Sequence, residues 1–587
     1  MRATIRALPL TMLLAALAVP EAHAATFRVG SGRGCMHEDV QDAVDAAASH
    51  PGFDVIFVTR TLEYTKQAIR IRDQEVALIG GFPNCVVDAN DAQKTVLSGA
   101  GGEPASVVSI SGKSWVMLVM LEIQNGDVAN LGLDFESLGG GIHIWGRSEV
   151  GLENVIVANN RAHHGGGIAL GKLVEAGISP DSGASILRIG AGTYINFNDG
   201  GYAGGGVYCV GDSTIKEDSR IEMVQSPSVI FGNKAWNGGG IAARNCKVDI
   251  ASGGLLFPAV SGNSAIDNGG GIDAVGPRTE VRLFTREPDQ PVRIHGNFAD
   301  ETGGGIRVAN GAVVNAWHAI VDRNEAEHGG GVYVGRSAPG PRAHFALLPP
   351  ERDPPRGARP AGAVACSEKL GCNRIADNRA GWDDMSASAL QVDRGDALLD
   401  SALVFGNAGG VVLRAATESK EPERTELELR NVLVANNAEI GSSVLHVGAD
   451  TRVLIDGSTL ASRRRSTAST LVRVETWSEL LVERSILYAA PGVGVLRSDA
   501  PLPQGAFRYV MASEVASLPA GTGVVADDPR FVDPSILNYR LAPDSPALDF
   551  APIHDPWPFD LDRRDRVRDL PEITNLYGAR DLGAYER

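Results

Sequence analysis

The stretch Gly329-Gly-Gly-Val-Tyr-Val-Gly335 decides the fold of this chain, because its pattern occurs repeatedly. A glycine triplet followed by Ile or Val begins at Gly139, Gly165, Gly204, Gly238, Gly269, Gly303 and Gly329. Successive triplets lie 26, 39, 34, 31, 34 and 26 residues apart. This is an internal repeat with variable insertions, and a unit of about 26 residues fits one three-strand coil of a solenoid.

The residues after each triplet alternate as a short strand requires. The first and third positions are mostly apolar, as in Ile306 and Val308, and we expect them to point inward. The position between them is mixed, and we expect it to face solvent; it holds His143, Ala169, Tyr208, Ala242, Asp273, Arg307 and Tyr333. Identical positions in neighbouring coils then lie about 4.8 Å apart, as in a parallel sheet. The sequence therefore predicts an all-β, right-handed parallel β-helix.

Glycine and asparagine mark the corners of the predicted coils. Glycine suits a corner that needs a positive φ or close backbone stacking, where a Cβ would obstruct. An asparagine stands five or six residues before each triplet except the first, and we expect these side chains to form a structural ladder: Asn160, Asn198, Asn233, Asn263, Asn297 and Asn324. Weaker repeats around Asn378, Asn407 and Asn437 extend the β-helix, predicted over 101–500, to about residue 500.

Both ends of the repeat differ from its middle. Residues 1–24 resemble a signal peptide, with basic Arg2 and Arg6, an apolar run and the small-x-small site at Ala22-His-Ala24. Residues 25–100 are expected to form an N-terminal cap and the first coils, with an amphipathic helix at 36–48. Residues 501–587 abandon the repeat and are predicted to cap the second end.

An insertion interrupts the repeat between Pro339 and Pro360. Proline and arginine crowd this stretch, so the sequence predicts that residues 339–360 loop outward rather than pair in a sheet.

Charge and hydropathy limit the compartments and the kinds of partner that are expected for this chain. The 587 residues carry 54 basic and 71 acidic side chains, a formal net charge of −17. This balance opposes binding to nucleic acid or anionic lipid. No later stretch of about 18 apolar residues follows the leader, so a transmembrane helix is not expected. The sequence predicts a secreted or periplasmic protein, with association to the cell surface as an open alternative.

Six cysteines fit an oxidising compartment. Their spacing matches no zinc pattern, so we interpret them as structural. Six cysteines allow 15 pairings. Cys35 with Cys85 is the pair we favour, and the pairing of the others stays open.

Three features together resemble the pectin-lyase-like superfamily of bacterial right-handed β-helix proteins: Ile79-Gly-Gly-Phe-Pro-Asn-Cys85, the glycine-triplet repeats and the C-terminal tail. The repeats are also similar to those of polymorphic outer-membrane proteins, a resemblance that implies an adhesin. Ser545-Pro-Ala-Leu-Asp549 and Asp581-Leu-Gly-Ala-Tyr-Glu586 resemble the closing segment of many secreted β-helix proteins. That resemblance indicates the architecture of the chain but gives no information about its activity.

One column of residues suggests a binding surface. The residue two before each triplet is Ser137, His163, Tyr202, Trp236, Asp267, Glu301 or Glu327. Tyr202 and Trp236 suit stacking on sugar rings. Carboxylates in neighbouring coils would stand roughly 5 Å apart, within the range of paired glycosidase acids.

The same residues admit other interpretations. The resemblance to pectate lyases implies an alternative in which Asp273 and the carboxylates hold Ca²⁺ and Arg307 is the base. Turn residues of an acidic solenoid can also be Asp, Glu or Tyr without any ligand.

The leading hypothesis is an exported, non-catalytic scaffold or adhesin that binds a glycan or a protein, requires no cofactor and has an open oligomeric state. The alternative is a polysaccharide lyase or glycoside hydrolase that uses Asp267, Glu301, Glu327 and Arg307.

Overall fold

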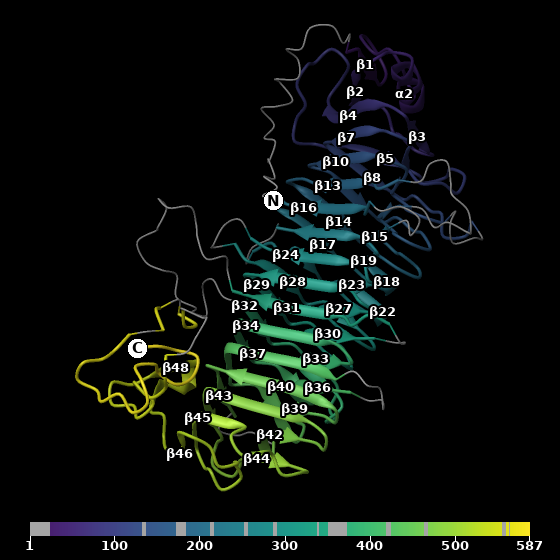
Figure 1. The fold of residues 1–587 in the computed structure, drawn as a ribbon. Helices are drawn as coiled ribbons and strands as arrows, with labels where there is room; N and C mark the ends of the chain where they lie inside the picture. Colours follow the sequence, from purple (N-terminus) through teal and green to yellow (C-terminus); the bar gives the residue numbers. More distant parts are fainter. Residues whose placement is uncertain are drawn as a thin grey trace.

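The computed structural model describes residues 24–131, 137–171, 183–211, 217–251, 256–285, 290–336, 340–349, 373–417, 424–462, 468–553, 559–562, 564–566 and 568–587. They form an elongated solenoid of stacked coils (Figure 1). Two long parallel sheets run along it, sheet A with 27 strands and sheet B with 14. The predicted parallel β-helix is confirmed. The predicted leader lies outside the described residues.

One coil shows how the repeat folds. It passes in order through β19 (Ile241–Arg244), β20 (Lys247–Ile250), β21 (Val260–Ser261) and β22 (Ser264–Asn268). β19 belongs to sheet B and follows a triplet, whereas β20 and β21 belong to sheet A. β19 pairs in parallel with β23 (Ile272–Val275) of the next coil. Ile241 and Ala243 are fully buried, as the alternation predicts for inward positions.

Sheet B contains one strand from each coil. Its strands are β3 (Ile69–Arg72), β6 (Val108–Ser111), β9 (Ile142–Ile144), β12 (Ile168–Leu170), β15 (Val207–Val210), β19, β23, β27 (Ile306–Ala309), β30 (Val332–Gly335), β33 (Ala387–Asp393), β36 (Val411–Ala416), β39 (Ser443–Val447), β42 (Thr470–Val474) and β44 (Gly494–Ser498). Its last strand ends near the predicted limit of the β-helix at residue 500.

Sheet A forms the other wall and continues slightly further. Its strands are β1 (Thr26–Val29), β2 (Phe53–Thr59), β4 (Glu75–Phe82), β5 (Thr95–Ser98), β7 (Trp115–Val119), β8 (Leu121–Gln124), β10 (Glu149–Glu153), β11 (Ile156–Ala158), β13 (Ile186–Ile189), β14 (Thr193–Asn196), β16 (Arg220–Met223), β17 (Ser228–Phe231), β20, β21, β24 (Glu280–Leu283), β25 (Val292–His295), β28 (Val313–Trp317), β29 (Ala319–Asp322), β31 (His344–Leu348), β32 (Asn373–Ala376), β34 (Asp396–Phe405), β37 (Thr425–Val434), β40 (Thr451–Asp456), β41 (Thr459–Ala461), β43 (Glu479–Tyr488), β45 (Phe507–Ala512) and β46 (Val524–Ala526).

The outer face of sheet B is more buried than the sequence suggested. Ala169, Tyr208, Ala242 and Asp273 were expected to face solvent, but all four are buried. The corner before each triplet folds back over this face. Gly238 has φ +63°, and a Cβ there would lie 2.7 Å from the Cβ of Ala242. The triplets therefore provide both the positive φ and the close contact that let each corner cover its own strand.

The predicted asparagine ladder is present and extends over nine coils. Each side chain is almost fully buried, and each Nδ2 except the last donates to Oδ1 of the next asparagine at 3.0 Å. The ladder residues are Asn160, Asn198, Asn233, Asn263, Asn297, Asn324, Asn378, Asn407 and Asn437. Each Nδ2 also donates to a carbonyl of the preceding coil, as Asn233 does to Ile195 at 2.9 Å. The ladder is structural, as predicted.

A helix covers the first coils. α2 (Val40–Ala48) lies inside the predicted range and begins after Asp39, whose carboxylate accepts from the backbone N–H of Gln41 at 2.7 Å. Its buried residues pack into the main core. The helix contacts β1, β2 and β3, so it closes the edge that stacking leaves open. Figure 1 shows it at the N-terminal end of the stack.

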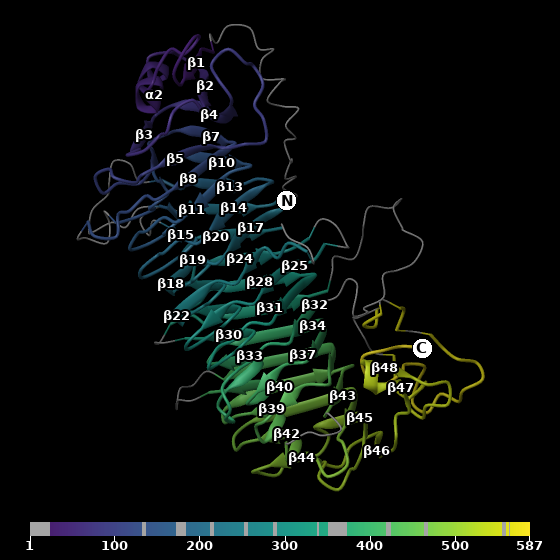
Figure 2. The same ribbon diagram turned by 180° about the vertical axis from the view of Figure 1, so that it is seen from behind.

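The C-terminal residues divide between two places. Leu502 and Leu518 pack against the end of the main core, as a cap should. Later residues lie instead against the side of the last coils, where Leu548 and Phe550 share a buried cluster with Ile486 of β43. Figures 1 and 2 both show this yellow segment beside the lower rows of strands. It includes the short antiparallel pair β47 (Phe531–Asp533) and β48 (Asn538–Leu541), around the 3-10 turn η2 (Pro534–Ile536).

Part of the proline-rich insertion was predicted wrongly. Residues 344–348 form β31, which pairs in parallel with β28 and β34 in sheet A. Phe345 and Leu347 are fully buried in the core. The prolines at 341 and 349 flank this strand and do not interrupt it, so no ladder hydrogen bond is lost. Residues 339 and 350–360 of the insertion lie outside the described residues.

Two disulfides link described residues. Cys35 is bonded to Cys85, the pair favoured from the sequence, and Cys209 is bonded to Cys246. The first ties the segment before α2 to the turn that follows β4. The second joins β15 to the corner after β19. Cys366 and Cys372 lie outside the described residues.

Candidate functional site

Between each ladder asparagine from Asn198 onward and the strand of sheet B that follows it, the chain forms a further column of parallel segments, which we call the ridge. It comprises residues 199–203, 234–237, 264–268, 298–302, 325–328, 379–385, 408–410 and 438–440. Three of its segments pair as a sheet of β18 (Lys234–Asn237), β22 and β26 (Phe298–Ala299), and β35 (Ala408–Gly409) pairs with β38 (Ala438–Glu439). Bridges from Phe298 to Glu325 to Arg379 to Ala408 connect these groups.

Five of the seven residues of the predicted column lie on the ridge, and Ser137 and His163 precede it. Bridges join Ala203 to Asn237 and Asn268 to Thr302 to His328, and Asn237 pairs with Asn268. Each column residue directly precedes one of these positions: Tyr202, Trp236, Asp267, Glu301 and Glu327. Counting back from the triplets therefore aligned five residues that directly precede paired positions, although a β-bulge shifts the register between Ala235 and Asn237.

The two aromatic residues of the column are exposed yet held in place. Tyr202 is 52% exposed and Trp236 is 47% exposed. The Tyr202 ring stacks parallel to His163, with centroids 5.7 Å apart and an interplanar angle of 3°. The indole Nε1 of Trp236 donates to Oδ2 of Asp267 at 3.2 Å. Both rings are oriented before any ligand arrives, which lowers the entropic cost of binding.

The acidic part of the column lies on the open surface. Glu301 and Glu327 are exposed, whereas Asp267 is partly buried and receives the Trp236 hydrogen bond. Exposed Asp300 and Glu325 add to the negative charge nearby. In the part of the chain that the structure describes, no group of three or more His, Cys, Asp or Glu residues is arranged to hold a metal ion. The carboxylates of the column therefore do not form the cluster that the Ca²⁺ alternative requires.

Arg307 and Asp273 form a separate pair beneath the corner. Asp273 is fully buried and accepts from both Arg244 and Arg307, with Arg307 Nη1 at 3.0 Å from its Oδ1. Burial acts to raise the pKa of Asp273, but the two guanidinium groups outweigh it and hold that pKa below its usual value. Arg307 thus neutralises a buried carboxylate and is not brought together with the carboxylates of the column.

Sequence reasoning missed the apolar side chains that share the ridge. Five further exposed residues lie on it: Ile266, Phe298, Trp382, Met385 and Ile440. In three neighbouring segments of the ridge, Ala265, Ala299 and Ala326 are buried against one another. The signal available in the sequence was an apolar residue next to the column, as Ile266 stands next to Asp267. Because the sequence comparison followed one residue per coil, it did not include these apolar neighbours.

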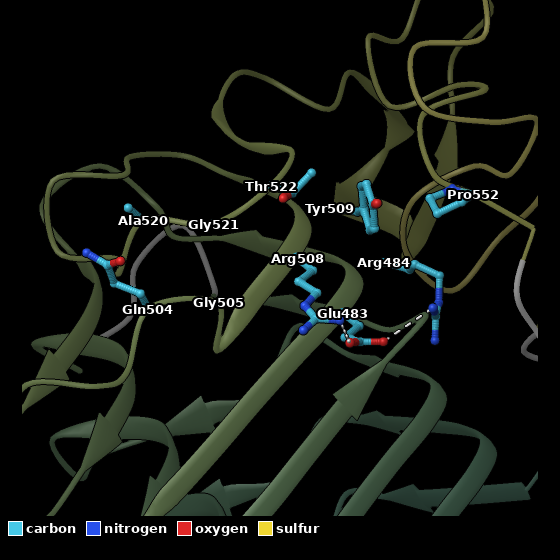
Figure 3. Close-up of a pocket in the computed structure, with 10 residues that line it drawn as sticks. All are labelled: Glu483, Arg484, Gln504, Gly505, Arg508, Tyr509, Ala520, Gly521, Thr522 and Pro552. Carbon is cyan, nitrogen blue, oxygen red and sulfur yellow. Dashed lines mark ion pairs between the residues drawn. The ribbon is translucent and has the colours of Figure 1, made fainter.

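A pocket lies elsewhere, between the last coils and the C-terminal segment. Its volume is about 850 Å³, and its lining includes Glu483, Arg484, Gln504, Arg508, Tyr509 and Pro552. Figure 3 shows Glu483 between the two arginines, with ion-pair distances of 3.3 Å to Arg484 and 3.9 Å to Arg508. None of the residues predicted as a site lines this pocket.

The fold and ridge define the class of the protein, a parallel β-helix with an exposed aromatic and acidic ridge. No family model matches the chain, and no curated protein is significantly similar to it. Among the described residues, no helix is long and apolar enough to cross a membrane.

Proposed function

We propose that this chain is an exported, non-catalytic scaffold that binds a neutral or amino-bearing polysaccharide along its ridge. The observation that carries the proposal is the pair of exposed, oriented rings of Tyr202 and Trp236 in adjacent coils. Aromatic faces of this kind provide a large contact area for sugar rings, with little conformational freedom to lose.

The repeat of the ridge favours a polymer as the ligand. Equivalent positions recur at about 4.8 Å along the stack, so a chain lying along it meets similar contacts at each coil. Exposed apolar residues continue to Trp382 and Ile440, several coils beyond Trp236. Exposed apolar patches on a soluble protein mark interaction sites. A long ligand gains from many such weak contacts at once.

Charge favours an uncharged or basic glycan. Glu301, Glu327 and Asp300 offer acceptors for sugar hydroxyl or ammonium groups. The same carboxylates, and a net charge of −17, repel polyanionic chains. The leader-like residues 1–24 and the two disulfides support export to an oxidising compartment.

Affinity electrophoresis through gels containing neutral, amino-bearing and acidic polysaccharides tests the proposal. We expect retardation by a neutral or amino-bearing polymer, and at least a fivefold loss of affinity in Trp236→Ala and Trp382→Ala. Trp477→Ala is the matched control, since Trp477 is 78% exposed, close to the 76% of Trp382, but lies off the ridge. Equal losses in all three variants, or no retardation by any polymer, would contradict the proposal.

The same polymers should be incubated with the protein and assayed for new reducing ends. Release of product that is lost in Glu301→Gln would replace the scaffold with the enzyme alternative. We expect none, because the carboxylates of the column are spread along an open surface and Arg307 is paired with Asp273.

A further inference from the structure

The pocket of Figure 3 differs in charge from the rest of the molecule. The chain carries a net charge of −17, but the pocket is lined by two arginines and one glutamate. Its volume of about 850 Å³ lies within the range of small-molecule sites in proteins, about 300–1,000 Å³. Arg508 places an exposed guanidinium in this concavity, and such a cation attracts small anions from solution.

The two arginines have different roles. Arg484 is 11% exposed in its side chain and forms a fork with Asp456, at 2.9 Å from Nε to Oδ1 and 2.6 Å from Nη2 to Oδ2. Arg508 is 59% exposed in its side chain, and its Nη1 lies 3.9 Å from Glu483. An exposed pair at that separation contributes little. Arg508 therefore keeps its hydrogen-bond donors available for a ligand. Arg484 is instead fixed by Asp456 and has a structural role in the lining of the pocket.

The remaining lining residues suit a hydroxylated molecule. Gln504 and Thr522 carry amide and hydroxyl groups that both donate and accept. The aromatic ring of Tyr509 packs edge-to-face against Tyr577, with ring centroids 5.3 Å apart. In Figure 3 the Tyr509 ring and Pro552 stand on one side of the pocket, and Gln504 stands on the other.

We propose that this pocket binds a sugar acid of mono- to disaccharide size, with its carboxylate on Arg508 and its ring or chain against Tyr509. A planar guanidinium matches a carboxylate with two parallel hydrogen bonds, which a hydroxyl group alone cannot replace. The site is separate from the ridge, so its occupancy does not depend on whether the ridge binds a polysaccharide.

The pocket couples its ligand to the C-terminal segment. Pro552 belongs to that segment, which packs on the side of β43 and β45 through residues such as Ala551. A ligand between Arg508 and this wall contacts both parts. Binding should therefore reduce hydrogen exchange in the peptides that contain Pro552 and Tyr577.

Isothermal titration at low ionic strength, with lactobionate and the neutral sugar lactose as probes, tests the assignment on the full-length protein. We expect saturable binding of lactobionate, at least tenfold weaker binding of lactose, and at least a tenfold loss for lactobionate in Arg508→Gln. Arg452→Gln is the matched control, because Arg452 is also exposed, lies in sheet A and faces a glutamate at 3.5 Å.

Three results would overturn the proposal: no binding of lactobionate, equal binding of lactose, or unchanged affinity in Arg508→Gln. Gln504→Ala keeps the test independent of any structural effect at Arg508, and we expect it to weaken lactobionate by about threefold to tenfold. Retained affinity in this variant would contradict the orientation proposed for the ligand.

Discussion

The backbone N–H and the side-chain amide of Asn233 both donate to one oxygen, Oδ1 of Asn263, each at 3.0 Å. The same double contact repeats along the ladder. Each asparagine thus satisfies two donors of its neighbour where water does not reach, since both residues are only 1% exposed. This relationship explains why the same amide recurs in nine coils.

Asn263→Ala should destabilise the protein by about 2–5 kcal/mol, because it leaves two buried donors of Asn233 without an acceptor. Chemical denaturation, followed by circular dichroism, measures this. Asn90→Ala, at an exposed position, is the control and should change stability by less than about 0.5 kcal/mol. Equal effects of the two substitutions would show that the ladder contributes nothing specific.

Two glycines separate backbone strain from crowding. Gly262 has φ +59° and no atom within 4 Å of the position that a Cβ would take, whereas Gly238 has φ +63° with Ala242 at 2.7 Å from that position. Gly262→Ala should cost about 1–2 kcal/mol from the left-handed backbone alone. Gly238→Ala should cost about 1–3 kcal/mol more, through overpacking. Thermal and denaturant unfolding measure the loss of stability in each variant. Equal losses would show that the corner at Gly238 can shift to accommodate a Cβ at no extra cost.

The disulfide between Cys35 and Cys85 closes a loop with a sequence separation of 50. Closing a loop of this length removes chain entropy from the unfolded state worth about 4 kcal/mol. Replacing both cysteines with alanine should therefore loosen residues 25–85, including α2, more than the distant coils. Hydrogen exchange resolves the two regions. Uniform loosening along the whole β-helix would show that the disulfide does not act locally.

The C-terminal segment should respond to pH through Glu586. Burial, with the nearby Asp581 carboxylate, raises the pKa of Glu586 from 4.5 to about 9, although Arg566 and Arg580 oppose this. The folded state therefore prefers the protonated acid. Its contribution to stability is complete below pH 4.5 and is lost as the pH rises towards 9.

Glu586→Gln mimics the protonated form and should flatten the loss of thermal stability between about pH 6 and pH 9. Burial raises the pKa values of Asp560 and Asp581 to about 6 each, so their effects on stability occur below this pH window. Differential scanning fluorimetry across pH provides the measurement, with Glu479→Gln as a partly exposed control. A decline as steep as that of the wild type would exclude Glu586 as its source.

Local patterns in the sequence determined the coil. The triplets, the alternation after them and the asparagines predicted the strands, the corners and the ladder, because each depends on contacts between identical positions one repeat apart. Ile306 and Val308 point inward for this reason. The same regularity alone placed five residues in one column: Tyr202, Trp236, Asp267, Glu301 and Glu327.

Only the tertiary structure decided what lies over the coils. It buried Tyr208 and Asp273 beneath the corners, paired Arg307 with Asp273, and joined Cys209 to Cys246. It also laid the C-terminal segment against the side of β43 and formed the pocket at Arg508. Asp273 and Arg307 occupy the same repeat position in neighbouring coils, but the repeat does not say which positions the corner covers. The other contacts join residues with no shared repeat position, and their energies depend on shape and burial, which no periodicity in the sequence encodes.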